Sequence, residues 1–500
     1  MTFAIPPAAG RWRAEKPPEG RSTRAMMIIS VIIICSKIQQ KRLPFTRRGG
    51  GLTEVGIMPQ HDSASDWLPL SLAQADFWQE FLCHRDRALS TVAHFVEFGD
   101  GVQVQALQQA IATTLQETDV FALELRLPKG ASLPQQRVNP QRRPALQILD
   151  LQHCEHPGHA ARHLMQQDID KPLDLLHDPL AASWLIRLAP ERVIWYIRAH
   201  HIIIDGFAMS LIEHRCATLY RHALGEGAAG ERLNAFPAFL DEELTYDASP
   251  RCVKDRRYWQ ERVAGVALPV LSTDRDDYCI APLHAAGQPS AQLSAGLQQL
   301  ALRCDTGWPD LLLALSAAWL SQALPARRDE PYAPFTAWVP LMNRRGRVAG
   351  YVPALAVNTL PLRLQLHPEQ TLADWLAEVA GDLQRLRACG RYRIERLAAD
   401  CGLAQGSRFL YAPLINVMPF DPPTFFGCDT VRSVMASGNV DGCNLSWRAR
   451  TDGSGLELDL DASPALFNAA ELADQGAELL AFIGRVLEEG ALQRRVGDLL

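Results

Sequence analysis

Two adjacent histidines stand before an aspartate-glycine pair in the stretch RVIWYIRAHHIIIDGFAMSLIEH, residues 192–214. A neutral imidazole, with an unperturbed pKa of about 6.5, is the side chain best suited to accept a proton at neutral pH. We therefore expect one of the two histidines, His200 or His201, to face a substrate and handle a proton. Asp205 is expected to turn inward on a tight turn that Gly206 permits, and to pair with a cation from elsewhere in the chain.

The histidine motif falls on a connection between a strand and a helix. Residues 192–199, RVIWYIRA, are rich in β-branched and aromatic residues and predict a buried strand. After Gly206, apolar residues recur at three- and four-residue spacing, which predicts a helix that ends at Gly225. Rigid scaffolds commonly hold catalytic groups on loops that leave a buried strand, so this position favours a catalytic interpretation over two incidental histidines.

Strand and helix patterns alternate along the chain, which predicts an α/β protein. We expect an N-terminal lobe over residues 66–240 and a C-terminal lobe over residues 250–500, and we interpret residues 236–247, FPAFLDEELTYD, as part of the connection. The remaining clear patterns predict strands at 90–100, 332–342 and 354–366, and helices at 102–118, 308–324, 371–389 and 468–490.

Composition excludes several classes of protein. A chain of 500 residues that is 47% hydrophobic can bury more than one core. Its formal net charge of −6, from 50 basic and 56 acidic residues, gives no field that would attract nucleic acid or an anionic membrane. The 11 cysteines include no CxxC pair, which favours free thiols in a cytoplasmic protein. No GxxxxGK[ST], no GxGxxG after a strand and no HExxH occurs, so neither a nucleotide nor a metal site is predicted.

The first 57 residues differ from the rest of the sequence. They are basic and punctuated by Pro and Gly around one apolar run, residues 25–35, which is shorter than the ~20 residues that a membrane span needs. Basic residues follow the run and no small-residue cleavage site does, so the pattern indicates no secretory signal; a weak membrane anchor is the alternative. We expect residues 1–57 to be a disordered or mis-assigned leader, with the functional chain beginning near Met58.

Several stretches, taken with the histidine motif, resemble one family. AHHIIIDGFAM resembles the HHxxxDG motif of the condensation domains of nonribosomal peptide synthetases, which have the chloramphenicol-acetyltransferase-like fold. The resemblance covers roughly Asp66 to Leu500 and is strongest toward the N-terminal condensation domain of enterobactin-type synthetases, through LMNRRGR. Other stretches resemble motifs of the family in the family's order: LPLSLAQADFW, AFPAFLDEE with DRRYWQERVAG, YVPALAVNTLPLRL and SRFLYAPLINVMPFD.

The departures from the family pattern limit what the resemblance implies. The family's R-H-E-x-L-R-T motif is reduced to ETDVFAL, residues 117–123, which lacks a basic residue usual there. Both histidines are present, which disfavours the heterocyclising branch, whereas epimerisation domains share the motif. No adenylation signature and no GGxS carrier motif occurs, so we expect a stand-alone condensation protein or a detached piece of a synthetase.

The resemblance implies two chloramphenicol-acetyltransferase-like lobes that form a V-shaped pseudo-dimer with the active site in the cleft. It implies an acyltransferase that joins a carrier-bound acyl thioester to an amine. His201 is then the base or a positioning group, and His200 braces the loop behind it. The implied partners are an acyl (aryl) carrier protein and a peptidyl carrier protein or free amine, with an adenylation protein as a further candidate. Phosphopantetheine arrives on these carriers, and the chain itself is expected to be a monomer that binds no cofactor and no metal.

Resemblance assigns Arg344 as a supporting residue, and residue type and sequence context suggest further ones. Asp205 is expected to pair with Arg344 of MNRRG, with Arg345 as the fallback and a solvated turn as the alternative for this basic run. Asn416 is a candidate to face substrate, although an asparagine in an apolar strand more often binds local backbone, and we expect this of Asn358. Trp338 is expected to pack in the core rather than line a tunnel.

Two other functions stay open at this point. One is an acyltransferase of the same fold that uses coenzyme A instead of a carrier. The other is an inactive docking module of a synthetase, which the intact HHxxxDG argues against and the reduced second motif argues for. If the chain is a condensation domain, its likeness to the enterobactin-type domain predicts an aryl donor of the 2,3-dihydroxybenzoyl kind, in a catecholate siderophore pathway.

Overall fold

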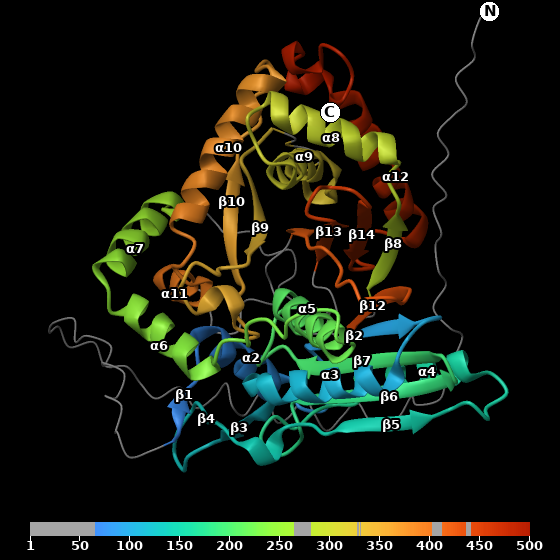
Figure 1. Cartoon of the computed structure of the whole chain (residues 1–500). Helices are drawn as coiled ribbons and strands as arrows, with labels where there is room; N and C mark the ends of the chain where they lie inside the picture. The colour runs from blue at the N-terminus through green and yellow to red at the C-terminus, as the bar shows by residue number, and fades with distance from the viewer. Residues whose placement is uncertain (1–65, 265–281, 328–329, 331, 403–412, 437–441) are drawn as a thin grey trace, which may run out of the picture. The chain divides into compact units, whose positions relative to one another are not determined.

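The computed structural model describes residues 66–264, 282–327, 330, 332–402, 413–436 and 442–500. From Trp67 to Leu500 the described residues belong to one compact unit. The expected leader, residues 1–57, lies outside them. Within this unit the chain forms two large sheets and one small sheet, with helices packed against them (Figure 1).

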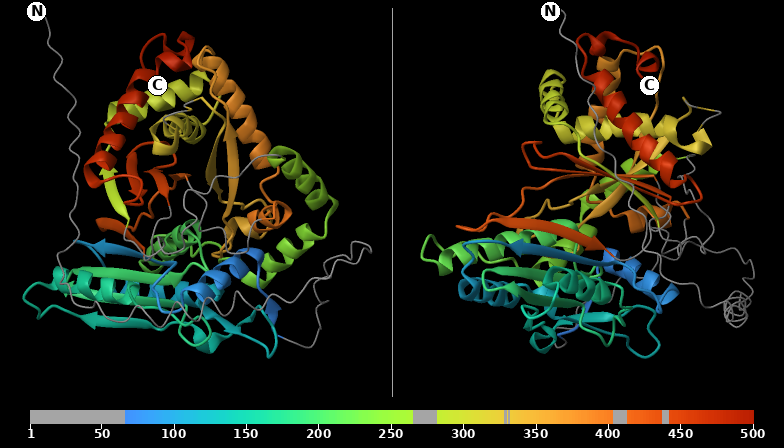
Figure 2. Two further views of the ribbon diagram at one scale, coloured as in Figure 1. Left: turned by 180° about the vertical axis from the view of Figure 1, so that it is seen from behind. Right: turned by 90° about the vertical axis from the view of Figure 1, so that its right-hand side faces the viewer.

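A five-stranded sheet carries the histidine motif. Its strand order is β12-β2-β7-β6-β5, and all neighbours are antiparallel except β5 and β6. Helices α3 and α5 cover one face and α4 the other (Figures 1 and 2). The bounds are β2 Thr91–Phe98, β5 Leu146–Asp150, β6 Ala181–Ala189, β7 Arg192–His200, β12 Thr430–Ala436, α3 Val104–Glu117, α4 Pro157–Ile169 and α5 Gly206–Ala223.

The sequence of β7 explains why this strand is central. Trp195 and Ile197 pack into the core under α3 and α5, whereas Ile194 and Tyr196 pack on the opposite side against α4. A strand that is buried on both faces reads as a continuous apolar run rather than an alternating one. The predicted strand at residues 192–199 is therefore confirmed, and its last residue in the sheet is His200.

The second large sheet has the strand order β10-β9-β11-β13-β14-β8. Strand β11 runs parallel to β9 and β13, and the other pairs are antiparallel. Its core includes Trp338, Trp375 and Trp447, all at most 1% exposed. The bounds are β8 Leu283–Gly287, β9 Phe335–Leu341, β10 Asn358–Leu364, β11 Leu414–Pro419, β13 Cys443–Ala449, β14 Glu457–Ala462, α8 Ala291–Arg303, α9 Trp308–Ala323, α10 Leu372–Ala388 and α12 Ala469–Val486.

Strand β12 belongs to the C-terminal half of the sequence but pairs with a strand of the N-terminal half. It follows β11 along the chain, yet it pairs antiparallel with β2 over seven positions, from Thr430 opposite Phe98 to Ala436 opposite Val92. The next strand, β13, returns to the six-stranded sheet. The five-stranded sheet is therefore completed by a segment more than 300 residues from its neighbour, which the sequence patterns did not predict.

Helices and a small sheet join these layers. Residues 236–247, interpreted above as part of the connection between the lobes, form helix α6. The helix buries Phe236, Phe239, Leu240 and Tyr246, whose spacings of three, four and seven residues place them on one face. The remaining bounds are α2 Leu72–Cys83, α7 Pro250–Val263, α11 Ile394–Asp400, β1 Leu68–Pro69, β3 Leu123–Arg126, β4 Gln135–Val138 and the short 3₁₀ turns at 119–122, 140–142, 325–327, 349–351, 491–493 and 496–498.

The described residues contain neither a helix suited to a membrane nor a cluster suited to a metal ion. None of their helices has the length and apolar character needed to cross a bilayer. Nor do these residues bring three or more His, Cys, Asp or Glu side chains together in a way that could hold a metal ion.

Candidate active site around the histidine motif

The loop between β7 and α5 holds the motif in a fixed backbone. The His201 N–H donates to the carbonyl of Ser90, the residue before β2, at 2.7 Å, and the Ile203 N–H donates to the His200 carbonyl at 3.1 Å. Residues Ile202–Ile204 are at most 1% exposed, so the three apolar positions of HHxxxDG anchor the loop in the core. Burial of these three side chains thus fixes the positions of the polar residues on either side of them, His201 and Asp205.

His200 is a buried, neutral side chain. Its Nδ1 accepts the Ile202 N–H at 3.0 Å, so the ring hydrogen lies on Nε2. Burial, aided by the charges of neighbouring His201 and Arg198, lowers the pKa of His200 to about 3. The ring is therefore neutral at physiological pH and serves the loop, as the sequence interpretation of a bracing residue requires.

His201 is partly exposed and has a defined tautomer. Its Nδ1 lies 3.0 Å from the Ile204 carbonyl oxygen, which can only accept a hydrogen bond, so Nδ1 carries the hydrogen. In the neutral ring the lone pair then lies on Nε2. Phe77 of α2 stacks on the His201 ring, with centroids 5.9 Å apart and planes at 13°, and meets His200 edge-on at 6.2 Å. The sequence analysis missed Phe77, although it belongs to the LPLSLAQADFW stretch.

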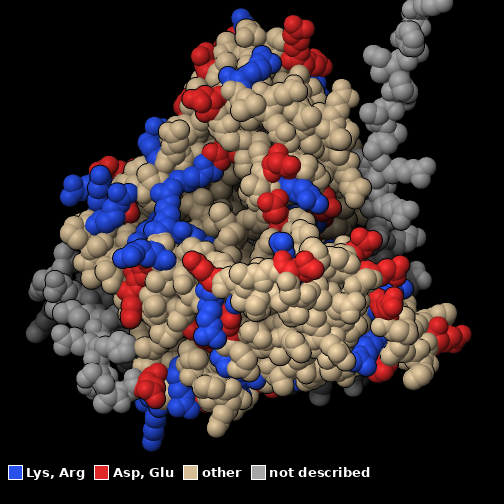
Figure 3. All heavy atoms as spheres, viewed as in Figure 1, with Lys and Arg blue, Asp and Glu red and all other residues tan. Residues whose placement is uncertain are grey.

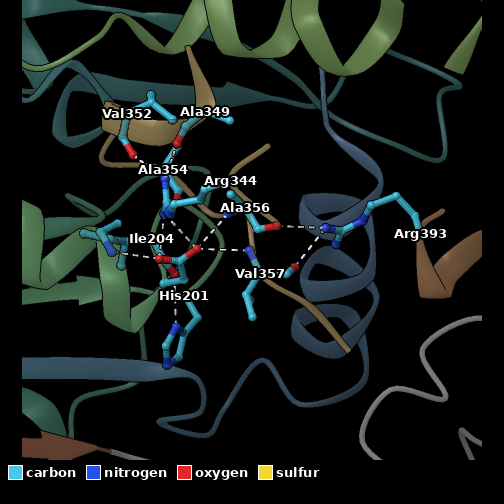
Figure 4. A network of polar contacts seen from close by, with 11 residues as sticks. His201, Ile204, Arg344, Ala349, Val352, Ala354, Ala356, Val357 and Arg393 are labelled. Carbon is cyan, nitrogen blue, oxygen red and sulfur yellow. Dashed lines mark hydrogen bonds and ion pairs between the residues drawn. The ribbon is translucent and has the colours of Figure 1, made fainter. Parts of the chain in front are cut away.

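Asp205 is the most connected side chain of the motif (Figure 4). As the N-cap of α5, its Oδ1 accepts the Ala208 N–H at 2.8 Å. Its Oδ2 accepts the N–H groups of Ala356 and Val357 at 2.9 and 3.0 Å, and both oxygens lie within 3.0 Å of Arg344 Nη2. The carboxylate therefore joins the start of α5 to two separate segments of the C-terminal half.

Arg344 occupies the place predicted for the partner of Asp205. Its side chain is 5% exposed, and its Nη atoms donate to the carbonyls of Ala349, Val352 and Ala354 at 2.6–3.0 Å. The guanidinium carbon lies 5.0 Å from the centroid of the Phe207 ring. A planar group with five donors suits such a convergence of carbonyls and one carboxylate. The alternative of a solvated turn is wrong for this residue.

The residues beside Arg344 divide into exposed and tightly packed ones. Arg345, the fallback partner, is exposed. A Cβ on Gly346 would lie 1.9 Å from Glu242 Oε2, so a side chain there would collide with α6. The two Glu242 oxygens accept the N–H groups of Arg347 and Ala349 at 2.8 and 3.1 Å, which fixes the loop that carries Arg344.

Gly206 has a different role from the one expected. It is the first residue of α5 and does not adopt the left-handed backbone that only glycine tolerates well, so the turn does not depend on it. A Cβ at this exposed position would have no neighbour within 4 Å, so Gly206 leaves open space at the start of α5, beside the histidine loop. The explanation of Gly206 as the residue that permits a tight turn is corrected accordingly.

The three remaining candidates lie in the six-stranded sheet. The Asn358 Nδ2 donates to the Gly390 and Tyr392 carbonyls at 2.8 and 2.9 Å, so it binds backbone as expected, although this backbone is 32 and 34 positions away rather than local. Trp338 is fully buried in the core, also as expected. Asn416 lies on β11 and is partly exposed, which keeps its side chain a candidate for substrate contact.

The reduced second motif, residues 117–123, has structural contacts. Glu117 forms a double ion pair with Arg215 of α5, at 2.6 and 2.9 Å. Asp119 Oδ2 accepts the N–H of Phe236, the first residue of α6, at 2.7 Å, and burial raises the pKa of Asp119 to about 6. The acidic residues of this segment therefore hold α5 and α6 in place.

The surface above α5 is hollowed (Figure 3). Lys and Arg side chains gather on one side of the hollow, over α7 and α10. In this view the hollow lies directly above the helix that begins at Gly206.

The fold and the site define the class of protein. The sequence model of the Condensation domain family matches residues 64–499. The chain therefore belongs to the condensation domains of nonribosomal peptide synthetases, and the predicted family and α/β fold of two lobes are confirmed.

Three known proteins illustrate the likeness. The solved structure of VibH, an NRPS condensation enzyme, superposes with a TM-score of 0.77 at 30% identity, covering 85% of this chain and all of that one. Isonitrile lipopeptide synthase of Streptomyces coeruleorubidus is 30% identical over 88% of this chain, and enterobactin synthase component F of Escherichia coli O157:H7 is 26% identical over 86%. The chain spans only 30% and 33% of the length of those two synthases.

Proposed function

We propose that this chain forms an amide bond between an acyl group held as a thioester on a carrier protein and an amine acceptor. The observation that carries the proposal is the hydrogen bond from His201 Nδ1 to the Ile204 carbonyl, 3.0 Å long. It places the lone pair of the neutral ring on Nε2, where a base acting on an amine needs it. Family membership supports the same reaction class.

The proposed reaction balances without any further reactant. The amine nitrogen attacks the thioester carbonyl carbon, the carbon-nitrogen bond forms, and the carbon-sulfur bond breaks. His201 Nε2 takes the proton shed by the amine and returns it to the departing sulfur, so the phosphopantetheine arm leaves as a free thiol. Holding both substrates in one place supplies most of the rate enhancement, and the positioned base adds about 10²–10⁴-fold.

The roles of the neighbouring residues follow from their contacts. Asp205 and Arg344 fix the loop that presents His201, His200 braces that loop, and Gly206 leaves room for the substrates. Asn416 on β11 is a substrate-facing residue in this proposal. The chain itself holds no cofactor, because the phosphopantetheine arrives on the carrier proteins.

The donor is proposed to be an aryl thioester and the acceptor an amine that is free or held on a second carrier. This choice rests on the likeness to enterobactin synthase component F, and no side chain of the described residues specifies it. An adenylation protein that loads the aryl carrier is the further partner that such a donor requires.

The test is a reconstitution with the full-length chain. Carrier proteins loaded with 2,3-dihydroxybenzoyl, aminoacyl or fatty-acyl groups are mixed with free or carrier-bound amines, and the amide product is followed by mass spectrometry. Amide formed from carrier thioesters, and lost in His201→Ala, supports the proposal. Equal turnover with acyl-CoA, measured as free thiol, would instead assign a coenzyme A-dependent acyltransferase, and no amide with any donor would assign a docking role.

A further inference from the structure

Arg393 is a buried cation that the proposed reaction does not use directly. It immediately precedes α11, and its side chain is 5% exposed. Its Nε and Nη2 donate to the two oxygens of Glu395 at 3.0 and 2.9 Å. Its Nη1 donates to the carbonyls of Ala356 and Val357 at 3.2 and 2.8 Å. These hydrogen bonds hold the buried guanidinium in a single orientation.

The same two residues also contact Asp205, from the other side. The N–H groups of Ala356 and Val357 donate to Asp205 Oδ2, whereas their carbonyls accept from Arg393 (Figure 4). The Ala356 carbonyl and the Val357 N–H belong to a single peptide group. This peptide therefore lies between a carboxylate on its N–H side and a guanidinium on its C=O side, which is the favourable orientation of its dipole.

We propose that Arg393 is a positioning residue for the histidine motif, acting on Asp205 through the Ala356–Val357 peptide. Hydrogen bonds in a chain polarise one another in a low-dielectric interior, so the guanidinium strengthens the N–H donors that hold the carboxylate. Asp205 follows Ile204, whose carbonyl sets the tautomer of His201, so a change in Asp205 reaches the reacting ring. This inference rests on the proposed function only where catalytic rate is the readout.

Asn358 holds the backbone that carries Arg393 beside the Ala356–Val357 peptide. The Asn358 Oδ1 accepts the Ile394 N–H at 3.0 Å, while its Nδ2 donates to the Gly390 and Tyr392 carbonyls. The segment that carries Arg393 is thus tied to the first residue of β10, directly after Val357. Asn358 contributes to the site by this route rather than by contact with substrate.

The charged groups around Arg393 and around His201 determine how a substitution should change the protonation of His201. Glu395, Glu243 and Asp76 act on Arg393, and Asp205 and His200 are the ionisable neighbours of His201 within the motif. Removal of the Arg393 charge leaves Asp205 less compensated, which favours protonation of His201. Removal of the Glu395 charge has the opposite effect and disfavours protonation of His201. A role limited to packing predicts neither shift.

The experiment compares Arg393→Gln, Arg393→Lys and Glu395→Gln with the wild-type chain. We expect kcat for Arg393→Gln to fall roughly 10- to 100-fold with little change in KM, and the acidic limb of the pH–rate profile to move to higher pH. Arg393→Lys restores the charge and should return the limb toward its wild-type position. Glu395→Gln should move it to lower pH, and it keeps the test decisive if Arg393→Gln does not fold.

A second readout does not depend on the proposed reaction. The pH dependence of carbethoxylation of His201 by diethyl pyrocarbonate, located by mass spectrometry, reports when the ring becomes neutral. The same opposite shifts are expected for Arg393→Gln and Glu395→Gln. Arg396→Gln is the matched control, because Arg396 lies three residues after Arg393, on α11, but pairs with Asp247 at 2.7 Å. We expect no shift for it.

The outcomes separate the two proposals. If the wild-type chain forms no amide but the carbethoxylation curves shift as described, the reaction assignment fails and the role of Arg393 stands. If the Arg393 and Glu395 variants titrate His201 as the wild type does, while only their melting temperatures fall, Arg393 is a packing residue and the inference is overturned.

Discussion

Asp205 and Arg344 are separated by 139 positions in the sequence and meet as a buried ion pair, with Arg344 Nη2 lying 2.8 and 3.0 Å from the two carboxylate oxygens. Both side chains are 5% exposed. The pair joins the N-terminus of α5, where the histidine motif ends, to the loop after β9. It therefore links the stability of the fold to the position of the candidate base.

Removal of Arg344 should leave a buried carboxylate without its cation. We expect Arg344→Ala and Asp205→Ala each to lower the free energy of unfolding by about 3–5 kcal/mol, measured by urea denaturation. Arg345→Ala, at the exposed neighbouring position, is the control and should change it by less than about 0.5 kcal/mol. Equal effects at 344 and 345 would contradict a buried pair.

A charge reversal should not rescue this site. In Asp205→Arg with Arg344→Asp the two charges could attract, but the new arginine cannot accept the N–H groups of Ala208, Ala356 and Val357. The double variant should therefore be at least as unstable as either single one. Recovery of the wild-type melting temperature would mean that the ion pair alone, and not the backbone contacts, accounts for the role of Asp205.

Substitutions at Gly346 and Gly206 should differ in their effect on the melting temperature. Gly346→Ala places a Cβ against the Glu242 carboxylate, which must then leave the N–H groups of Arg347 and Ala349. The variant should lower the melting temperature by several degrees and impair activity, because the loop of Arg344 loses these contacts. Gly206→Leu projects into open space and should leave the melting temperature nearly unchanged while it lowers turnover. Gly350→Ala, where a Cβ meets nothing within 4 Å, is the control for both.

His200 should make the chain sensitive to acid. Its pKa in the folded state is about 3, below the ordinary 6.5, so the unfolded chain binds the extra proton between these values. Its contribution to stability is present above pH 6.5 and is lost, at about 1.4 kcal/mol per pH unit, as the pH falls toward 3. His200→Asn should flatten the dependence of unfolding free energy on pH between 5 and 6.5, whereas exposed His159→Asn should not. An unchanged slope in His200→Asn would show that the ring is not buried in its neutral form.

Asp119 should make the chain less stable as the pH rises, which is the opposite of the effect of His200. Burial raises its pKa from 3.8 to about 6, and its Oδ1 is buried without a partner. The stability contributed by the protonated form is present below pH 3.8 and is lost as the pH rises through 6. Asp119→Asn keeps an oxygen for the Phe236 N–H and removes the charge, so it should stabilise the chain by roughly 1–3 kcal/mol at pH 8 and by less at pH 5. Destabilisation at pH 8 would contradict the assigned cause.

The sequence predicted the elements around the motif well because their signals are local. The continuous apolar run 192–199 and the helical spacing after Gly206 both reflect burial of neighbouring side chains, and β7 and α5 follow them closely. The C-terminal end of α5 was also predicted, since Gly225 adopts a left-handed backbone with φ of 81°. Pairing of Asp205 with Arg344 was predicted only through resemblance, because no local pattern selects a partner 139 positions away.

Other parts of the site had no sequence signal. The N–H donors of Ala356 and Val357 belong to the backbone, and any residue except proline could supply them. Strand β12 carries no feature that selects β2 as its neighbour, since partner choice depends on the packing of the whole sheet. Phe77 was identified only as part of a motif, because the stacking of its ring on His201 depends on how α2 packs beside β7.

The most direct test of the central claim is the single-turnover rate of amide formation by His201→Ala with saturating, carrier-loaded donor and acceptor. The account predicts a fall of about 10²-fold or more with an unchanged melting temperature, because Nε2 acts on the reacting amine and the ring is partly exposed. Near-normal turnover of His201→Ala would contradict it. So would an Asp205→Ala variant that is fully stable yet inactive, because the carboxylate would then have the chemical role assigned here to the histidine.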